Sequence, residues 1–203
     1  MTTVLIRRTV CLGLLATVVA GASGCSSTVR EGRSPAYLIV QRIEAASGAE
    51  DDIFSDELSS DVLTNNSVFE DLARVTFRLG LKDIGPAGVP TSPTANNFIT
   101  VNRYTVTFRR TDGRNAPGVD VPYPFEGAGT VTVLATDSTM SFVIVRTQAK
   151  VESPLRELTN GGTVRTISTI ADITFYGRDQ AGNDVSVSGA ISVNFSDWGD
   201  PDA

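Results

Sequence analysis

The stretch Ala171–Phe195, ADITFYGRDQAGNDVSVSGAISVNF, decides the expected fold. In its second half, apolar residues alternate with serine and asparagine, and this period of two is typical of a strand with one buried face. The polar segment Asp179–Asp184 separates the two halves and contains the glycine that a tight turn favours. The stretch therefore predicts two antiparallel strands joined as a hairpin.

The same alternation recurs in earlier parts of the chain. In Ala73–Lys82, ARVTFRLGLK, the residues Val75, Phe77 and Leu79 share one face, and Arg103–Arg109 repeats the pattern. Further strands are expected where threonine, valine and isoleucine are enriched. These segments are Tyr37–Glu44, Gly129–Ala135, Met140–Val151 and Val164–Tyr176.

Two segments are predicted to be loops. Asp83–Asn97 holds three prolines, which donate no hydrogen bond to a β-ladder, so it is not a central strand. The acidic segment Glu50–Ser60 is expected to be a loop with one helical turn around Ile53–Leu58. A turn is expected at Thr111–Arg114.

About seven modest antiparallel strands with long crossing loops predict an all-β protein, an antiparallel Greek-key β-sandwich of two sheets. Ala36–Phe195 resembles bacterial immunoglobulin-like or fibronectin type III-like domains, most clearly in the closing hairpin quoted above. The region has no cysteine pair, and the only tryptophan, Trp198, follows the last strand, so an antibody-type domain is excluded. An eight-stranded barrel is the open alternative.

The first 24 residues, MTTVLIRRTVCLGLLATVVAGASG, have the order of a secretory signal peptide: two arginines, an apolar run and small residues. The apolar run Val10–Ala20 is shorter than the roughly 20 residues that span a bilayer. We therefore expect residues 1–24 to be cleaved. The Arg7-Arg8 pair resembles a twin-arginine signal, but the residues after it match that pattern poorly, which favours the general secretion route.

The residues before Cys25, Ala22-Ser23-Gly24, resemble the lipobox of bacterial lipoproteins, although Ala22 stands where that family prefers leucine, valine or isoleucine. The resemblance implies that Cys25 becomes the lipidated N-terminus, carrying acyl chains such as palmitate, and that residues 25–35 form a tether to a domain at 36–203. In that family, Ser26 after the cysteine implies the outer membrane. The alternative is ordinary cleavage near Ala22–Gly24, which would leave a soluble protein with a free thiol. We assign Cys11 to the discarded peptide.

The charge excludes one class of partner. The formal net charge is −6, and removal of residues 1–24, which hold two arginines and no carboxylate, makes it −8. The arginines are scattered and the only lysines are Lys82 and Lys150, so no basic stripe is present for nucleic acid. The expected partners are the membrane, through the lipid anchor, and another envelope or extracellular protein.

The absence of histidine excludes Ser-His-Asp and Cys-His catalysis. We expect no cofactor and no enzymatic activity, but a lipid-anchored structural or binding module of the cell envelope. The alternative is a carboxylate-dependent hydrolase of envelope glycans, which needs two acidic groups roughly 5 to 10 Å apart.

Three aromatic residues are candidates for contact with a partner: Tyr123, Phe125 and Trp198. Tyr123 and Phe125 lie in the proline-rich segment Asn115–Phe125 and can anchor a ligand from a stiff loop. Alternatively they close the end of the core, which is the interpretation that we favour. Trp198 can equally cover the edge of the sandwich.

Two acidic groups are candidates for calcium. One is the run Glu50–Asp61, which lacks a regular calcium-loop spacing. The other combines Asp179, Asn183 and Asp184 with the tail carboxylates Asp197, Asp200 and Asp202, which could meet at one end of a sandwich. Such residues are also the usual turn formers, so we expect no metal site.

Overall fold

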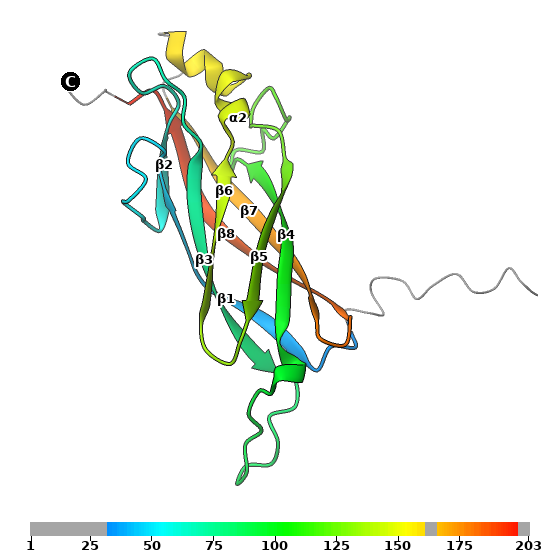
Figure 1. The fold of residues 1–203 in the computed structure, drawn as a ribbon. Coiled ribbons are helices and arrows are strands. Elements are labelled where there is room, and N and C mark those ends of the chain that lie inside the picture. Colours follow the sequence, from blue (N-terminus) through cyan, green and yellow to red (C-terminus); the bar gives the residue numbers. More distant parts are fainter. Residues whose placement is uncertain (1–31, 161–165, 199–203) are drawn as a thin grey trace, which may run out of the picture.

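Two β-sheets packed face to face form the body of the protein in the computed structural model, which describes residues 32–160 and 166–198 (Figure 1). In chain order the strands are β1 (Ala36–Ala46), β2 (Glu57–Asp61), β3 (Asp71–Leu81), β4 (Ile99–Arg109), β5 (Phe125–Val133), β6 (Ser138–Val145), β7 (Thr166–Asp179) and β8 (Asp184–Ser196). The short helices are η1 (Ala95–Asn97), α2 (Thr147–Val151) and η2 (Leu155–Asn160).

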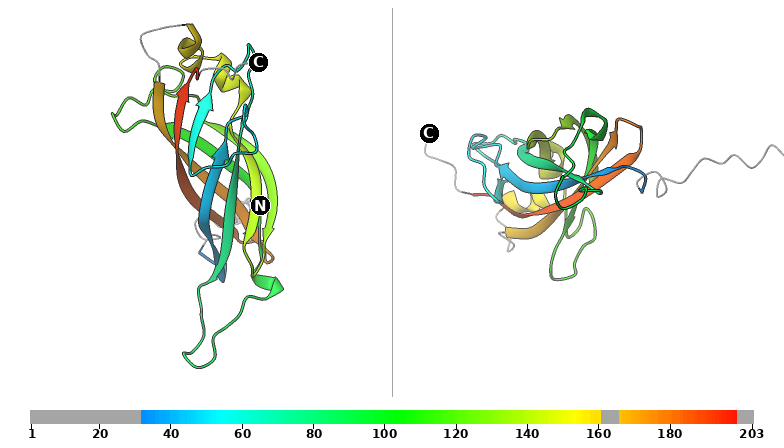
Figure 2. Two further views of the ribbon diagram at one scale, coloured as in Figure 1. Left: turned by 90° about the vertical axis from the view of Figure 1, so that its left-hand side faces the viewer. Right: turned by 90° about the horizontal axis from the view of Figure 1, so that it is seen from below.

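One sheet has the strand order β1-β3-β6 and the other has the order β2-β8-β7-β4-β5. Only β4–β5 and β7–β8 are chain neighbours that pair with each other among the described strands; the chain otherwise crosses from one sheet to the other. Figure 2 shows the two layers along the long axis of the molecule. The predicted all-β sandwich is confirmed, and the strands form two separate ladders rather than the closed barrel that the sequence left open.

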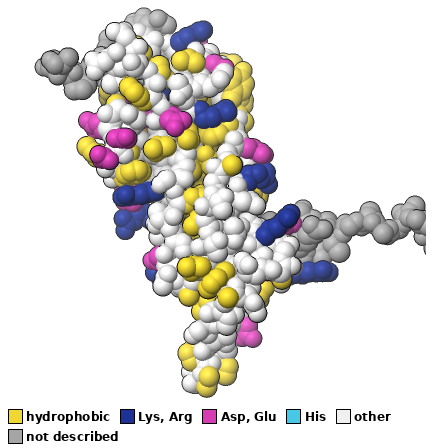
Figure 3. All heavy atoms as spheres, in the orientation of Figure 1, with side chains coloured by type: hydrophobic (Ala, Val, Ile, Leu, Met, Phe, Trp, Pro, Cys, Tyr) yellow, Lys and Arg dark blue, Asp and Glu magenta, His cyan; other side chains and the backbone are white. Residues whose placement is uncertain are grey.

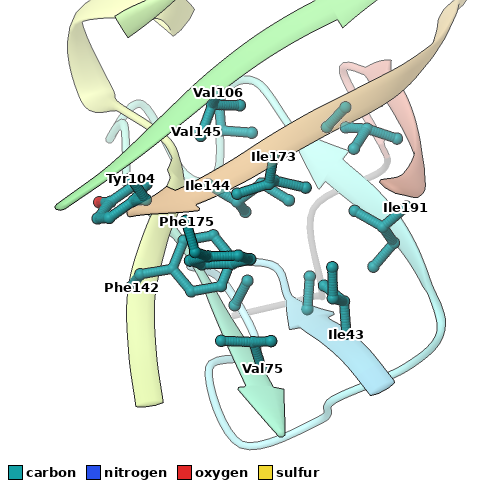
Figure 4. Packing of buried hydrophobic residues seen from close by; sticks show 14 of the residues in the cluster. Ile43, Val75, Tyr104, Val106, Phe142, Ile144, Val145, Ile173, Phe175 and Ile191 are labelled. Carbon is teal, nitrogen blue, oxygen red and sulfur yellow. The ribbon is translucent and has the colours of Figure 1, made fainter. Parts of the chain in front are cut away.

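Apolar side chains from both sheets meet in one core. In β3 the predicted inward residues Val75, Phe77 and Leu79 are buried, because alternate side chains of a strand point to the same face. The ring of Phe175 in β7 lies edge-on to the rings of Phe77 and Phe142, with centroids 5.0 and 5.3 Å apart. Figure 4 shows how Phe142 and Phe175 face each other between the layers. These contacts hold the two sheets together.

Several local predictions are confirmed. β7 and β8 form the hairpin expected at Ala171–Phe195, with Arg178 opposite Asp184. Residues 83–94 form a loop that leads into η1, and a turn occupies residues 111–113. At Gly189 of β8 an added Cβ would lie 2.6 Å from the Ile43 side chain, so glycine permits the close approach of β1.

The prediction for Glu50–Ser60 is wrong in its second part. Residues 57–61 form β2, which pairs in parallel with β8, so the sheet is not purely antiparallel. A helical turn over Ile53–Leu58 would pack both apolar side chains against the core. Leu58 is buried, but Ile53 is exposed. The sequence ELSSD has little β-propensity of its own, and β8 supplies the ladder that orders it.

The strand predicted over Met140–Val151 is too long. β6 ends at Val145, and residues 147–151 form α2, which buries Ala149 and Lys150. An ammonium group in the core needs fixed polar partners, and the helix brings Lys150 to them at one end of the sandwich. Tertiary contacts therefore override the strand propensity of this segment.

The sandwich has two ends with different contents. We call the end where β1 begins the N-terminal pole; it carries the loop between β3 and β4 and the β7–β8 hairpin (Figure 1). The opposite pole carries α2, η2, the loop between β4 and β5, and the end of β8. Among residues 32–160 and 166–198 we find no helix with both the length and the apolar character needed to cross a bilayer.

Candidate functional site

The expected lipidation residue, Cys25, lies outside the described residues. The first described residues after it are bound to the N-terminal pole. The ammonium of Lys82 donates to the Gly32 carbonyl oxygen at 3.4 Å, and the Lys82 backbone N–H donates to the Pro35 carbonyl oxygen at 2.9 Å. The chain therefore enters the domain beside the end of β3.

The three candidate calcium ligands of the β7–β8 turn have partners within the turn. The Asp179 carboxylate accepts hydrogen bonds from the backbone of Ala181 and from the backbone and side chain of Asn183, at 2.8 to 3.0 Å. Asp184 instead pairs with Arg178 at 2.7 Å. These contacts are those of residues that shape a turn.

The hydrogen bonds to Asp179 also determine its acidity. Burial alone would raise the pKa of the Asp179 carboxyl, but donors from Asn183, Ser34 and Ala181 together hold the pKa below its ordinary value. The charged form is therefore the form that the folded turn prefers.

Among the tail carboxylates, the described one, Asp197, is not near this turn. Asp197 follows the end of β8, whose 13 residues separate it from the β7–β8 turn by roughly 40 Å. The expectation that the two groups meet at one end is therefore wrong for Asp197, because the whole length of β8 lies between them; Asp200 and Asp202 lie outside the described residues. No group of three or more carboxylates forms a metal-binding cluster in the described part of the chain.

The three aromatic candidates are not brought together. Phe125 begins β5 and is buried, with its ring under the Arg146 guanidinium, 4.3 Å from centroid to Cζ. Tyr123 is half exposed and covers Gly118, where an added Cβ would lie 2.3 Å from the phenol oxygen. Trp198 lies beyond β8, next to β2, whereas Tyr123 lies next to β5 at the other edge of the five-stranded sheet.

Trp198 instead borders a small hollow at the opposite pole. Its backbone N–H donates to the Asp61 carboxylate at 3.0 Å, and the hollow of about 180 Å³ is also lined by Ser47, Glu50 and Thr64. A neighbouring hollow of about 260 Å³ is lined by Glu50 and Glu57. The acidic segment thus borders two shallow surface hollows.

Sequence reasoning missed a buried ion pair beneath this pole. The Lys150 ammonium is 2.7 Å from both the Asp71 carboxylate and the Asp61 carbonyl oxygen, and Lys150 and Asp71 are almost completely buried. The Ser60 hydroxyl and the Gly48 backbone N–H also donate to Asp71, at 2.6 and 2.9 Å. Burial raises the pKa of the Asp71 carboxyl, while the Lys150 ammonium acts in the opposite direction.

This network ties α2 to β2 and β3. Because both charged groups are enclosed, removal of either one alone would leave the other buried without a partner. Strand periodicity could not have found this pair. It places Lys150 on the face of Met140, Phe142 and Ile144, but it places the exposed Gln148 there too, because residues 147–151 are helical and not a continuation of β6.

A larger hollow lies over β4, β7 and β8, near the N-terminal pole. Its volume is about 760 Å³, and its lining residues are Asn102, Arg103, Tyr176, Gly177, Arg178, Asp184 and Val185. A β-bulge between Val101 and Arg103 of β4 interrupts the pairing with β7 at this point. At Gly177 an added Cβ would lie 2.4 Å from the Thr100 carbonyl oxygen, so only glycine allows the strands to approach here.

Charged and aromatic side chains border this groove. The Arg103 guanidinium lies 4.1 Å above the Tyr176 ring centroid and pairs with Glu126 at 3.2 Å. Arg178 pairs with Asp184. A guanidinium has five N–H donors, so both arginines keep donors for a ligand beyond these pairs. Among the described lining residues of the groove, Asp184 is the one carboxylate.

No protein-family model matches this chain, and no curated protein matches it at a significant level.

Proposed function

We propose that the protein is an exported, lipid-anchored cell-envelope protein whose immunoglobulin-like domain is a non-catalytic binding module. The anchor is an acylated Cys25, and Ser26 after it favours the outer membrane. The observation that carries the proposal is the entry of the chain: the segment that follows the lipobox-like sequence is bound to one pole, so an anchor at Cys25 would hold the sandwich by that end.

The strand arrangement supports the immunoglobulin-like assignment. The last two strands form a hairpin in the same sheet as β4 and β5, while β1, β3 and β6 form the other sheet. This division corresponds to the two sheets of an immunoglobulin-like sandwich, in which the chain crosses repeatedly between layers. β2 adds a short parallel edge strand beside β8.

The binding surface of the proposed module is the groove over β4, β7 and β8. It combines hydrogen-bond donors with one aromatic ring on rigid strands, and such surfaces hold a ligand at low entropic cost. A polar or acidic segment of an envelope partner suits the free donors of Arg103 and Arg178.

The anchor is tested in the full chain expressed in a bacterium with a labelled fatty acid. Wild-type protein should carry the label and sediment with membranes, whereas Cys25→Ser should lose the label and either leave the membrane fraction or accumulate as an uncleaved precursor. Cys11→Ser is the matched control and should behave like wild type, because Cys11 is assigned to the discarded peptide. Normal processing and membrane partitioning of Cys25→Ser would exclude the lipid anchor.

The binding surface is tested by crosslinking in intact cells. Arg103→Ala, which removes a guanidinium from the groove, should reduce the yield of crosslinked envelope partners severalfold. Arg42→Ala removes an exposed arginine from β1, on the other sheet, and should leave the yield unchanged. Equal yields for both variants would show that the groove is not the contact surface.

A further inference from the structure

The loop between β3 and β4 projects far beyond the N-terminal pole (Figures 1 and 2). Ile84 and Val89 are each 72% exposed, the highest values among the exposed large hydrophobic side chains. Figure 3 shows hydrophobic side chains gathered at the end of this projection. An isolated surface valine is ordinary, but paired aliphatic side chains at the end of a projecting loop need an explanation.

The tip of this loop has a defined shape. The Thr91 backbone N–H donates to the Ile84 carbonyl oxygen at 3.0 Å, and the Val89 N–H donates to the Pro86 carbonyl oxygen at 2.9 Å. Gly85 has a positive φ of 74° and donates its N–H to the Asp83 carboxylate at 2.9 Å. These bonds close residues 84–91 into a compact turn, so Ile84 and Val89 are presented with little conformational entropy left to lose.

The tip also lacks charge. From Ile84 to Asn102 the sequence contains no ionisable side chain, although the mature chain is strongly acidic overall. Lys82 and Asp83 stand at the base of the loop. Moving residues 84–90 out of water therefore desolvates no ionisable side chain of their own, and the Asp83 carboxylate, which accepts the Gly85 N–H, marks the limit of the uncharged tip.

The N-terminal segment leaves the domain at the same pole. Ala36 pairs with Leu81 at the end of β3, and Gly32 is bound by the Lys82 side chain at the base of the loop. Cys25 precedes Gly32 by seven residues, which span at most about 25 Å. An acyl anchor on Cys25 would therefore hold the bilayer within reach of the loop tip.

We propose that residues 84–90 insert into the lipid interface as a second membrane contact and orient the sandwich on the membrane. This proposal rests on the lipid anchor proposed above, since the anchor makes insertion an intramolecular event at high effective concentration. Ile84 and Val89 would enter the boundary between headgroups and acyl chains, with Asp83 and Lys82 left in water. The opposite pole would then face away from the bilayer.

The test uses the lipidated full-length protein, purified and reconstituted in phosphatidylcholine vesicles, with an environment-sensitive fluorophore on an introduced cysteine. In the mature protein acylation blocks Cys25, so Val89→Cys provides the one free thiol. The matched control is Val119→Cys, which is 70% exposed at the opposite pole. Vesicles contain a quencher attached to the lipid chains, and iodide serves as a water-soluble quencher.

We expect the probe at residue 89 to shift to shorter wavelength and to lose most of its fluorescence to the lipid quencher, with no change between low and high salt. The probe at residue 119 should respond to iodide alone. The variant Ile84→Asp with the probe at residue 89 should lose the quenching by lipid, while its unfolding midpoint stays that of the parent, because Ile84 is exposed.

Other outcomes overturn the proposal in distinguishable ways. If the protein is lipidated and iodide quenches the probe at residue 89, the loop does not insert, although the proposed lipid anchor is retained. A probe protected from both quenchers shows that the loop docks on protein, such as a second copy of this chain. Lipid quenching at both residues shows that the domain lies without a fixed orientation. Purified protein whose mass shows no acylation overturns the anchor and the orientation together.

Discussion

The loops Asp83–Phe98 and Arg110–Pro124 lie at opposite poles, have similar lengths and are both rich in proline and glycine, yet they differ in charge. In the second loop Asp112 pairs with both Arg110 and Arg114, at 2.7 and 2.8 Å. The first loop carries no charge beyond Asp83. Two loops that are equally rich in proline and glycine can therefore be adapted to different environments. Charged side chains that pair within a loop are well solvated in water, whereas an uncharged aliphatic tip can enter an apolar phase.

The lysines of the two poles also differ in their surroundings. At the opposite pole the ammonium of Lys150 is enclosed and paired with Asp71, whereas at the N-terminal pole Lys82 stays exposed and donates to the backbone carbonyl oxygen of Gly32. The opposite pole thus encloses an ion pair, whereas at the N-terminal pole the buried Asp179 carboxylate is held by hydrogen-bond donors of the β7–β8 turn. The predictions below challenge this contrast, beginning with the largest effect.

Lys150→Met should lower the free energy of unfolding by about 3–5 kcal/mol, because it leaves the Asp71 carboxylate buried without its cation. Lys82→Met should change it by less than about 0.5 kcal/mol, as for other surface positions. Urea titration monitored by circular dichroism measures both. The double variant Lys150→Met/Asp71→Leu should recover most of the loss; equal effects of the two lysine variants would remove the contrast between the poles.

Gly177→Ala should cost between about 1 and 3 kcal/mol, because the new methyl group meets the Thr100 carbonyl oxygen and forces β4 away from β7. Gly88→Ala is the matched control: no atom lies within 4 Å of its added Cβ. The control should leave the thermal midpoint nearly unchanged. If Gly177→Ala were as stable as the control, the close approach of β4 and β7 at the groove would not require glycine at this position.

Asp179→Asn should cost about 1 kcal/mol at pH 7, since the amide loses the charge that the donors of the turn favour. Because the folded-state pKa of Asp179 lies below its ordinary value, this stabilisation is present above the unfolded pKa and is lost as the pH falls through the folded pKa. The stability difference between wild type and variant should therefore shrink on acidification from pH 7 into the acid range.

Asp112→Asn is the comparison for this experiment. The hydrogen bond from Arg110, followed by that from Arg114, lowers the pKa of the Asp112 carboxyl as well, but this carboxylate lies on the surface, with its side chain 40% exposed. Water screens such surface pairs, so the effect of Asp112→Asn on the unfolding midpoint should be the smaller of the two. A larger effect at Asp112 would show that the paired surface charges contribute more to the free energy of unfolding than the hydrogen bonds of the turn at the N-terminal pole.

The sequence was most informative where periodicity is strong. In β3 and β8 the alternation predicted which side chains enter the core, because a strand packed on one face must separate apolar from polar residues. It was least informative for β2, whose five residues have no pattern of their own, and for α2, where strand propensity continued past Val145. Both elements depend on partners distant in the chain, and local propensity contains no information about them.

The candidate groove could not be predicted for the same reason. Arg103, Tyr176 and Arg178 come from β4 and β7, and their proximity requires the register of that strand pair, including the bulge after Val101. Phe125 and Trp198 were singled out as aromatic residues, but the sequence left open that one of them is buried and the other lies at the opposite edge of the sheet. Residue type alone does not determine exposure.

By itself, the sequence determined the all-β class, the faces of the strongest strands, the closing hairpin and the proline-rich loop Asp83–Asn97, because these depend on local periodicity and backbone chemistry. Only the tertiary structure decided that Lys150 meets Asp71, that β2 runs parallel to β8, and that the apolar loop tip and the N-terminal segment leave from one pole. These features join residues far apart in the chain, and their energies arise only after the two sheets have packed.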